Sequence, residues 1–130
     1  DLVAPQILAA TARPGRSLQV STDLTVAPPP DCAVLLAALE GRTREESLGL
    51  LKTALASGPA VAVVERVADA AHRDDHAAEM VLTSLVVTGQ PARTSSELEE
   101  LLREAGAARV ETRQVGWGFG HFGTVVFAHA

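Results

Sequence analysis

Two continuous apolar runs on either side of an amphipathic helix constrain the fold of this chain most strongly. Residues 32–36 read CAVLL and residues 60–64 read AVAVV. A strand without a polar position is typical of a parallel sheet that is covered on both faces. Between the two runs, residues 43–56 place three leucines at i, i+3 and i+7, on one face of a helix. This order predicts a strand–helix–strand unit and therefore an α/β fold.

Capping signals mark where the helices begin and end. Thr43 and Glu46 have the spacing of a capping box at the start of the leucine-bearing helix. Ser95 is the predicted N-cap of another helix, which ends at Gly106. Residues 76–88 are also predicted to be helical, although β-branched residues accumulate in their second half. These signals predict helices at three places in the chain.

Shorter segments complete the predicted α/β fold. Residues 2–12 are predicted as a short helix, residues 17–20 as a short strand, and residues 109–114 and 124–129 as two C-terminal strands. The segment GWGFGHFG at 116–123 connects those last two strands. The expected architecture is one domain with about five strands, mostly parallel, with an antiparallel C-terminal hairpin and helices on both faces of the sheet.

Composition excludes several classes of protein. The chain has 130 residues, 47% of them hydrophobic, which suffices for one packed domain and argues against a disordered chain. The formal net charge of -5 argues against a nucleic-acid-binding groove, and no apolar run approaches the ~18 residues of a membrane span. The single cysteine, Cys32, excludes an internal disulfide and is expected to be an inert thiol in a buried strand. We therefore expect a cytoplasmic protein without nucleic-acid or membrane partners.

All four aromatic rings gather near the C-terminus. They lie within the last 14 residues, and three of them stand with His121 in the glycine-rich segment 116–123. One interpretation is a ligand lid or docking patch in which Trp117, Phe119 and His121 contact a substrate or a partner. The other is a hairpin loop whose rings fold back over the edge of the sheet. Both interpretations stay open at the level of the sequence.

Two histidines of the chain have a spacing that a metal site could use. His72 and His76 are four residues apart, with Asp74 and Asp75 between them. On a helix this spacing suits a metal ion, but no third ligand lies near them in the sequence. We therefore expect a solvated polar loop and no metal.

The order of several segments resembles that of a known enzyme family. The segments are Asp1-Leu2, Thr22-Asp23-Leu24, Asp31 to Lys52, VVER at 63–66, and TGQPART at 88–94 followed by a helix. In this order the chain resembles bacterial S-adenosylmethionine-dependent O-methyltransferases that modify phenolic polyketides and antibiotics, and the resemblance covers nearly the whole chain. It implies a Rossmann-like methyltransferase sheet, S-adenosylmethionine as cofactor and a small aromatic metabolite as substrate.

The resemblance also implies roles for individual residues. Asp1 matches the acid that accepts hydrogen bonds from the cofactor ribose, and Asp23 and Leu24 match the pair beside the adenine. Glu65 matches an acid that orients a catalytic histidine, but Glu40 stands at the position of that histidine. These five residues are the cofactor-binding and catalytic candidates that the resemblance gives.

Glu40 and Glu65 are expected to form a carboxylate pair. A histidine base suits neutral pH because its pKa is about 6.5, whereas a glutamate needs burial or a neighbouring charge to raise its pKa. Two close carboxylates do not both ionise readily, so this pair could share a proton and act as a base. The alternative is that Glu40 is an exposed loop residue in a site that has lost its activity.

Further departures from the family pattern concern the substrate and the cofactor. Val81 and Ser84 stand where the substrate helix carries an Asp and a Met, which makes Ser84 a candidate substrate contact. No G-x-G-x-x-G turn lies between a strand and a helix, although such a turn lets the backbone approach a nucleotide cofactor. The chain is therefore expected to be the C-terminal portion of the catalytic domain, without its glycine-rich first half.

The expected truncation leaves the strand at 32–36 with a bare apolar edge, which is prone to aggregation. The strand at 17–20 could pair with it, a second copy of the chain could form a homodimer across it, or another polypeptide could complete the sheet. Only the last would restore a complete site for S-adenosylmethionine.

Three functions stay open. The first is transfer of a methyl group from S-adenosylmethionine to a hydroxyl of a small aromatic natural product. The second is a non-catalytic relative that binds a small molecule or a protein partner. The third is a cyclase or hydroxylase that reuses the same pocket.

Overall fold

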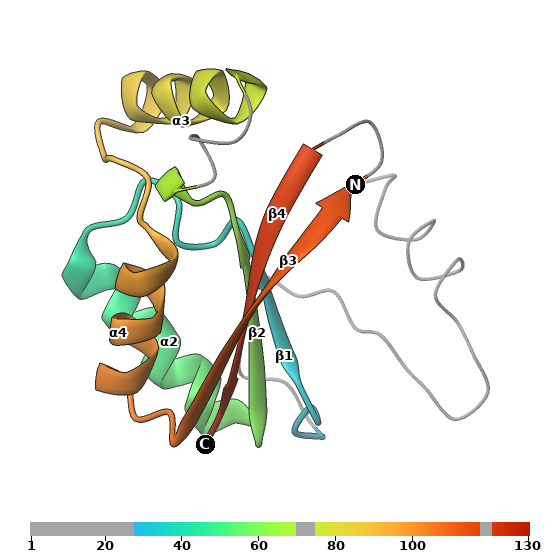
Figure 1. Cartoon of the computed structure of the whole chain (residues 1–130). Helices are drawn as coiled ribbons and strands as arrows, with labels where there is room; N and C mark the ends of the chain where they lie inside the picture. Colours follow the sequence, from blue (N-terminus) through green and yellow to red (C-terminus); the bar gives the residue numbers. More distant parts are fainter. Residues whose placement is uncertain (1–27, 70–74, 118–120) are drawn as a thin grey trace.

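The computed structural model describes residues 28–69, 75–117 and 121–130 (Figure 1). Within these ranges, the side chains of residues 75–77, 114–117 and 121–123 are outside the description. The predicted helix at 2–12 and the predicted strand at 17–20 also lie outside the described residues.

The described strands form one mixed sheet. Its order is β1 (Ala33–Leu36), β2 (Ala60–Glu65), β4 (His121–His129) and β3 (Arg109–Trp117). β1 runs parallel to β2, while β4 is antiparallel to both β2 and β3. The α/β class and the antiparallel C-terminal hairpin are confirmed. Four of the five predicted strands are present in the described part, and the fifth, residues 17–20, lies outside it. The described strands are joined by one parallel and two antiparallel pairings, so the expectation of mostly parallel strands is not met there.

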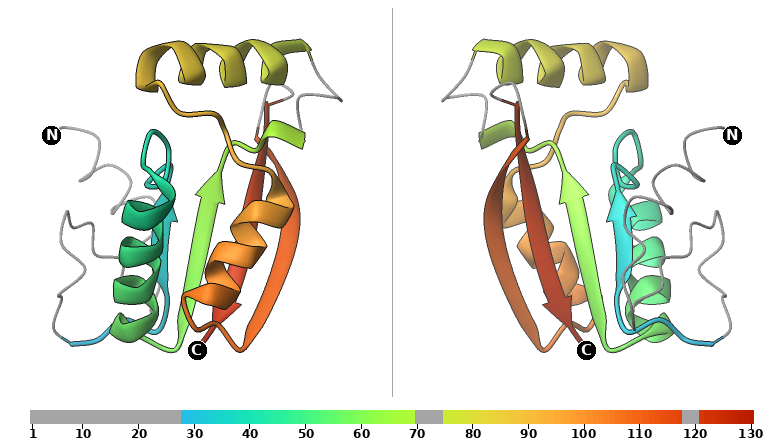
Figure 2. Two further views of the ribbon diagram at one scale, coloured as in Figure 1. Left: turned by 90° about the vertical axis from the view of Figure 1, so that its left-hand side faces the viewer. Right: turned by 90° about the vertical axis from the view of Figure 1, so that its right-hand side faces the viewer.

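Three helices surround the described sheet unequally. α2 (Arg44–Ser57) and α4 (Ser95–Glu104) lie side by side on one face, and α3 (Asp75–Thr88) lies across one end of the sheet (Figure 2). The prediction of helices on both faces is therefore not met within the described residues, where both face-covering helices occupy the same face. None of the described helices has the length and apolar content needed to cross a lipid bilayer.

The core lies between this helical layer and the sheet. It is aliphatic, because leucines from α2 and α4 meet valines from β2 and β4. Burial of each such side chain contributes roughly 1.5–3 kcal/mol of transfer free energy. The largest fully buried apolar side chains are Leu39, Leu51, Leu98, Leu102, Val61, Val63 and Val126.

Both helices of this layer begin with a capping box. At α2, the Thr43 amide donates to Glu46 Oε2 at 2.8 Å and the Glu46 amide donates to Thr43 Oγ1 at 3.3 Å, as predicted. At α4 the cap is Thr94, not the predicted Ser95. The reason is spacing: Glu97 lies three residues after Thr94, and its carboxylate accepts the Thr94 amide at 2.7 Å.

β1 differs from the prediction of a strand buried on both faces. Ala33 and Leu35 point into the core, but Val34 and Leu36 are 58% and 66% exposed. Successive side chains of a strand point to opposite faces, and α2 and α4 cover only one of them. Cys32, just before β1, is exposed rather than buried, so its predicted place inside a strand core is also wrong.

The C-terminal hairpin is longer than predicted. β3 continues to Trp117 and β4 starts at His121, and these two residues are paired in the ladder. Most of the glycine-rich segment 116–123 is therefore strand rather than connection. Because Glu65 at the end of β2 pairs with Thr124, the first residues of β4 extend past β2 toward the end of the sheet where α3 lies.

α3 is helical over its whole length, as expected for residues 76–88, despite its β-branched residues. Leu82, Leu85, Val86 and Val87 are all exposed, Val86 to 80%. On the opposite side, Ser84 is buried. The helix thus directs Ser84, together with Met80 and Val81, toward the pocket and these four apolar side chains away from it.

Candidate functional site

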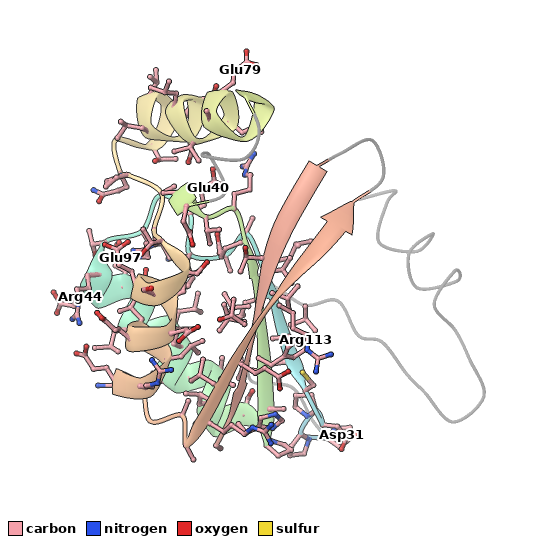
Figure 3. All side chains as sticks on the ribbon, in the orientation of Figure 1. Asp31, Glu40, Arg44, Glu79, Glu97 and Arg113 are labelled. Atoms are coloured by element: carbon pink, nitrogen blue, oxygen red, sulfur yellow. The ribbon has the colours of Figure 1, made fainter. Side chains whose placement is uncertain are left out.

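A small pocket lies where β1 and β2 end, beneath α3. Glu40 and Arg66 approach it from the loops after the two strands, Glu65 ends β2, Ser84 comes from α3, and Arg93 comes from the segment before α4. Figure 3 shows Glu40 between α3 and the end of the sheet. The carboxyl ends of parallel strands are the usual ligand-binding edge of an α/β sheet. The pocket encloses about 20 Å³, which is room for one or two water molecules.

Glu40 is held as an anion. Arg66 Nη2 lies 2.9 Å from Glu40 Oε1 and 2.7 Å from Glu40 Oε2. A hydrogen bond from the buried Ser84 side chain and this arginine together lower the pKa of Glu40 below its ordinary value. Glu40 is therefore ionised at neutral pH, and its carboxylate is bound by both Arg66 and Ser84.

Gly41 lets the loop that carries Glu40 approach α3. Its φ is +75°, a left-handed conformation that favours glycine. A Cβ at this position would lie 3.0 Å from Thr88 Cβ, so a larger residue would push the loop away from the helix end. The glycine thus keeps the loop and α3 close enough for Glu40 and Ser84 to meet.

Glu65 has the opposite electrostatic character. Its side chain is buried, and Glu65 Oε1 accepts the Leu39 amide at 2.7 Å. Burial raises the pKa of Glu65, the charge of Glu40 raises it further, and the Leu39 amide and the nearby Arg93 and Arg66 oppose the rise. The two carboxylates share one pocket, but their pKa values move in opposite directions.

The structure brings three predicted site residues together and leaves the others apart or undescribed. Glu40, Glu65 and Ser84 line the same pocket. Trp117 and His121 end β3 and start β4, but their side chains are outside the description. The remaining predicted site residues lie outside the described residues: Asp1, Asp23, Leu24 and Phe119.

Sequence reasoning gave no role to two arginines of the pocket. Arg66 directly follows the buried strand β2, and a charged residue at that place was the available signal. Arg93 lies in the segment TGQPART but received no role. Their partners Glu40 and Leu39 are 26 and 54 residues away in the chain, which no local pattern reveals.

A metal site is not formed by the described residues. In residues 28–69, 75–117 and 121–130, no group of three or more His, Cys, Asp or Glu side chains is placed to hold a metal ion. His72 lies outside these ranges, and the side chain of His76 is not described.

The described residues do not by themselves fit S-adenosylmethionine. The pocket of about 20 Å³ is far smaller than the roughly 300–1,000 Å³ of typical ligand sites. The described glycines with positive φ, Gly41, Gly89 and Gly106, follow β1, α3 and α4 but none opens a helix directly after a strand. The candidate cofactor residues Asp1, Asp23 and Leu24 are outside the description.

Comparison with known proteins identifies the fold. No protein-family model and no curated protein matches the sequence. Among solved structures, the mitomycin 7-O-methyltransferase MmcR matches with a TM-score of 0.71 over 99% of this chain at 22% identity. The chain shares its fold with O-methyltransferases. The match covers 37% of MmcR, and a match to LaPhzM covers 39% of that protein, so this chain spans less than half the length of these structures.

Two further structures with this fold contain cofactor or product. NcsB1, an O-methyltransferase from neocarzinostatin biosynthesis, was solved with S-adenosyl-L-homocysteine and 1,4-dihydroxy-2-naphthoic acid; it has a TM-score of 0.60 and 25% identity, covering 82% of this chain and 31% of NcsB1. Human N-acetylserotonin methyltransferase was solved with S-adenosylmethionine; it has a TM-score of 0.63 and 22% identity, covering 85% of this chain and 32% of that protein. The predicted Rossmann-like methyltransferase fold is confirmed, and the neighbours include enzymes of natural-product biosynthesis.

Proposed function

We propose that this chain is the C-terminal portion of an O-methyltransferase catalytic domain and carries the substrate side of its site. Together with polypeptide that supplies the cofactor half-site, it transfers a methyl group from S-adenosylmethionine to a hydroxyl of a small aromatic natural product. The observation that carries the proposal is the fold match to MmcR over 99% of this chain. The position of the pocket at the carboxyl ends of β1 and β2 supports it further.

The pocket supports a division of work between its two carboxylates. Glu40, whose pKa is lowered by Ser84 and Arg66, is a weak proton acceptor and serves as a fixed negative charge. Glu65, whose pKa is raised by burial, is better matched to accept a proton near neutral pH. In this proposal Glu65 acts as the general base, and the negative charge of Glu40 helps to keep the pKa of Glu65 raised.

The other predicted site residues keep their proposed roles. Asp1, Asp23 and Leu24 contact the cofactor, while Trp117, Phe119 and His121 contact the aromatic substrate or a partner chain. A second copy of the chain or another polypeptide completes the sheet next to β1, which lies at one edge of the described sheet. The cytoplasmic location, and the absence of nucleic-acid and metal partners, stay predictions.

Calorimetric titration tests the cofactor half of this proposal. S-adenosylmethionine is titrated into the full-length protein that contains this chain, with S-adenosyl-L-homocysteine as a second probe. Heat that fits a micromolar dissociation constant supports the proposal. Absence of heat at millimolar S-adenosylmethionine would overturn it.

Methyl transfer tests the roles of the carboxylates. Methyl-labelled S-adenosylmethionine and 1,4-dihydroxy-2-naphthoic acid serve as probes, and label in the acceptor is counted for the unchanged protein, Glu40→Gln and Glu65→Gln. We expect Glu65→Gln to lose about 10²-fold or more in rate, as for removal of a general base, and Glu40→Gln to lose less. Full activity in both variants would remove the carboxylate pair from the mechanism.

A second candidate function is a non-catalytic relative that binds a small molecule or a protein. Two observations favour it: the pocket encloses only about 20 Å³, and Arg66 and Glu40 neutralise each other there. The calorimetric titration separates the two candidates, because the second predicts no binding of S-adenosylmethionine.

A further inference from the structure

One guanidinium holds both ends of the loop that carries Glu40. Arg93 Nη1 donates to the Leu39 carbonyl at 3.0 Å, and Arg93 Nη2 donates to the Arg42 carbonyl at 2.7 Å and to Ser47 Oγ at 2.9 Å. Ser47 is fully buried in the first turn of α2, and its hydroxyl donates to the Thr43 carbonyl at 2.8 Å. Arginine presents five donors in a rigid planar fork, which allows one side chain to join these three acceptors.

The same loop is held from its other side by Glu65. The Leu39 amide donates to Glu65 Oε1 at 2.7 Å, while the Leu39 carbonyl accepts from Arg93. Both polar groups of this one residue are therefore occupied by pocket side chains, and Glu40 follows directly. Arg93 is itself fixed, because its backbone carbonyl accepts the Ala68 amide at 2.8 Å just beyond β2.

The backbone of this loop needs such support. Ala37 has a φ of 47°, in the left-handed region that non-glycine residues rarely adopt, and Gly41 has a φ of +75°. A residue in this region persists only when its surroundings hold it there. The Ala37 amide is bound to the Val64 carbonyl at 2.9 Å, and within the loop the Arg42 amide donates to the Leu39 carbonyl at 3.2 Å and Arg42 Nε donates to the Ala38 carbonyl at 2.8 Å. Arg93 and Glu65 add the bonds that join the Leu39–Arg42 segment to the rest of the pocket.

We propose that Arg93 is a positioning residue for the carboxylate pair of the pocket. Its guanidinium fixes the Leu39–Arg42 segment, so that the Leu39 amide reaches Glu65 and the Glu40 carboxylate reaches Arg66 and Ser84. The chemical use of the pair rests on the proposed function. The arrangement itself does not, because it involves only residues of this chain.

Arg93 can change the pKa values of Glu65 and Glu40 in two ways, through its charge and through the position of the loop, and these two effects can be separated. Glu65 faces Glu40, Arg93 and Arg66, so it responds both to the charge of Arg93 and to the loop. The pKa of Glu40 is lowered by the hydrogen bond from Ser84 and by Arg66, and both contacts require the loop to be in place. Arg93→Lys keeps the positive charge, so a change in the pKa of Glu40 in that variant acts through the position of the loop.

The test is an NMR titration of ¹³C-labelled glutamate carboxylates in the protein that contains this chain. Arg93→Met removes both charge and donors, and Arg93→Lys keeps the charge but not the fork. We expect the pKa of Glu65 to rise above its unchanged value in Arg93→Met, and the pKa of Glu40 to rise toward its ordinary value in both variants. Arg103→Met, which removes an exposed ion pair with Glu99 on α4, serves as the control and should move neither.

Two outcomes would overturn the proposal. One is that both folded variants titrate like the unchanged protein. The other is that Arg93→Met, Arg93→Lys and a third variant, Arg93→Gln, all fail to fold, because Arg93 would then maintain the fold as a whole. Neither the titration nor its controls require cofactor or substrate, so the result is independent of whether S-adenosylmethionine binds.

Discussion

α4 and α3 are both helices of this small domain, yet they use their leucines in opposite ways. In α4, Leu98, Leu101 and Leu102 are at most 3% exposed and pack on the sheet. In α3, Leu82 is 61% and Val86 is 80% exposed. The layer of α2 and α4 therefore carries the stability of the described structure. α3 contributes Met80, Val81 and Ser84 to the lining of the pocket, and its outward apolar side chains add little to that stability.

The largest expected effect is a matched pair of leucine deletions in these two helices. Leu102→Ala should cost about 2–5 kcal/mol in the free energy of unfolding, because it leaves a cavity in the core. Leu82→Ala removes the same atoms from an exposed position and should change that free energy by less than about 0.5 kcal/mol. Urea unfolding followed by circular dichroism measures both. Equal losses would show that α3 is as tightly packed as α4.

The next largest difference is expected between the loss of a threonine hydroxyl at the cap of α2 and the loss of one within α3. Thr43→Ala removes the N-cap side chain of α2 and should cost about 1 kcal/mol. The matched change in α3, Thr83→Ala, removes a hydroxyl that only donates to the Glu79 carbonyl on an exposed surface, and it should be within about 0.5 kcal/mol of neutral. The same urea titrations apply, and a larger loss for Thr83→Ala would contradict the comparison.

The pocket between the two regions should respond to pH in two directions. The pKa of Glu65 is raised, so its contribution to stability is present below its unfolded pKa of about 4.3 and is lost as pH rises through the native pKa. The pKa of Glu40 is lowered, so its contribution is present above about 4.3 and is lost as pH falls through the native pKa.

Urea midpoints measured across pH check this prediction. In Glu65→Gln, stability should fall less as the pH rises above the unfolded pKa. In Glu40→Gln, stability should fall less as the pH drops below that pKa. Each variant is the control for the other. Identical pH profiles for the two variants would contradict the opposite shifts.

The smallest effect is expected at the ion pair that joins α2 to α4 at the surface. The side chains of Arg44 and Glu104 are 64% and 44% exposed, so solvent and salt screen their attraction. Arg44→Ala should leave the melting temperature unchanged within error at physiological salt. A drop of several degrees would show that this layer depends on surface charge as well as on its leucines.

The helical layer was largely predictable from the sequence because its signals are local. Leucine spacing and the Thr43–Glu46 box predicted α2 within one residue at each end. At α4 the sequence predicts Ser95 as the N-cap, whereas Thr94 is the N-cap in the structure. The position is decided by Glu97, whose side chain completes the capping box three residues after Thr94. Such errors concern single positions and leave the element intact.

The burial of β1 was not predictable in the same way. An apolar run shows that a strand can be buried on both faces, but whether it is depends on what covers each face. α2 and α4 lie on the same face, so Val34, Leu36 and Cys32 are exposed. The fold class could be predicted, whereas the covering of each strand could not.

The sequence alone determined the described helices, most of the described strands and the presence of Glu65 at the end of a strand, because these patterns act over one or two turns of chain. Tertiary structure alone decided the direction in which the pKa of each carboxylate is shifted. Glu40 meets Arg66 across 26 residues, and Leu39 meets Glu65 across 26 and Arg93 across 54. A pKa depends on burial and on charges nearby in space, and only the packing of α3 and the two loops against the sheet brings those groups together.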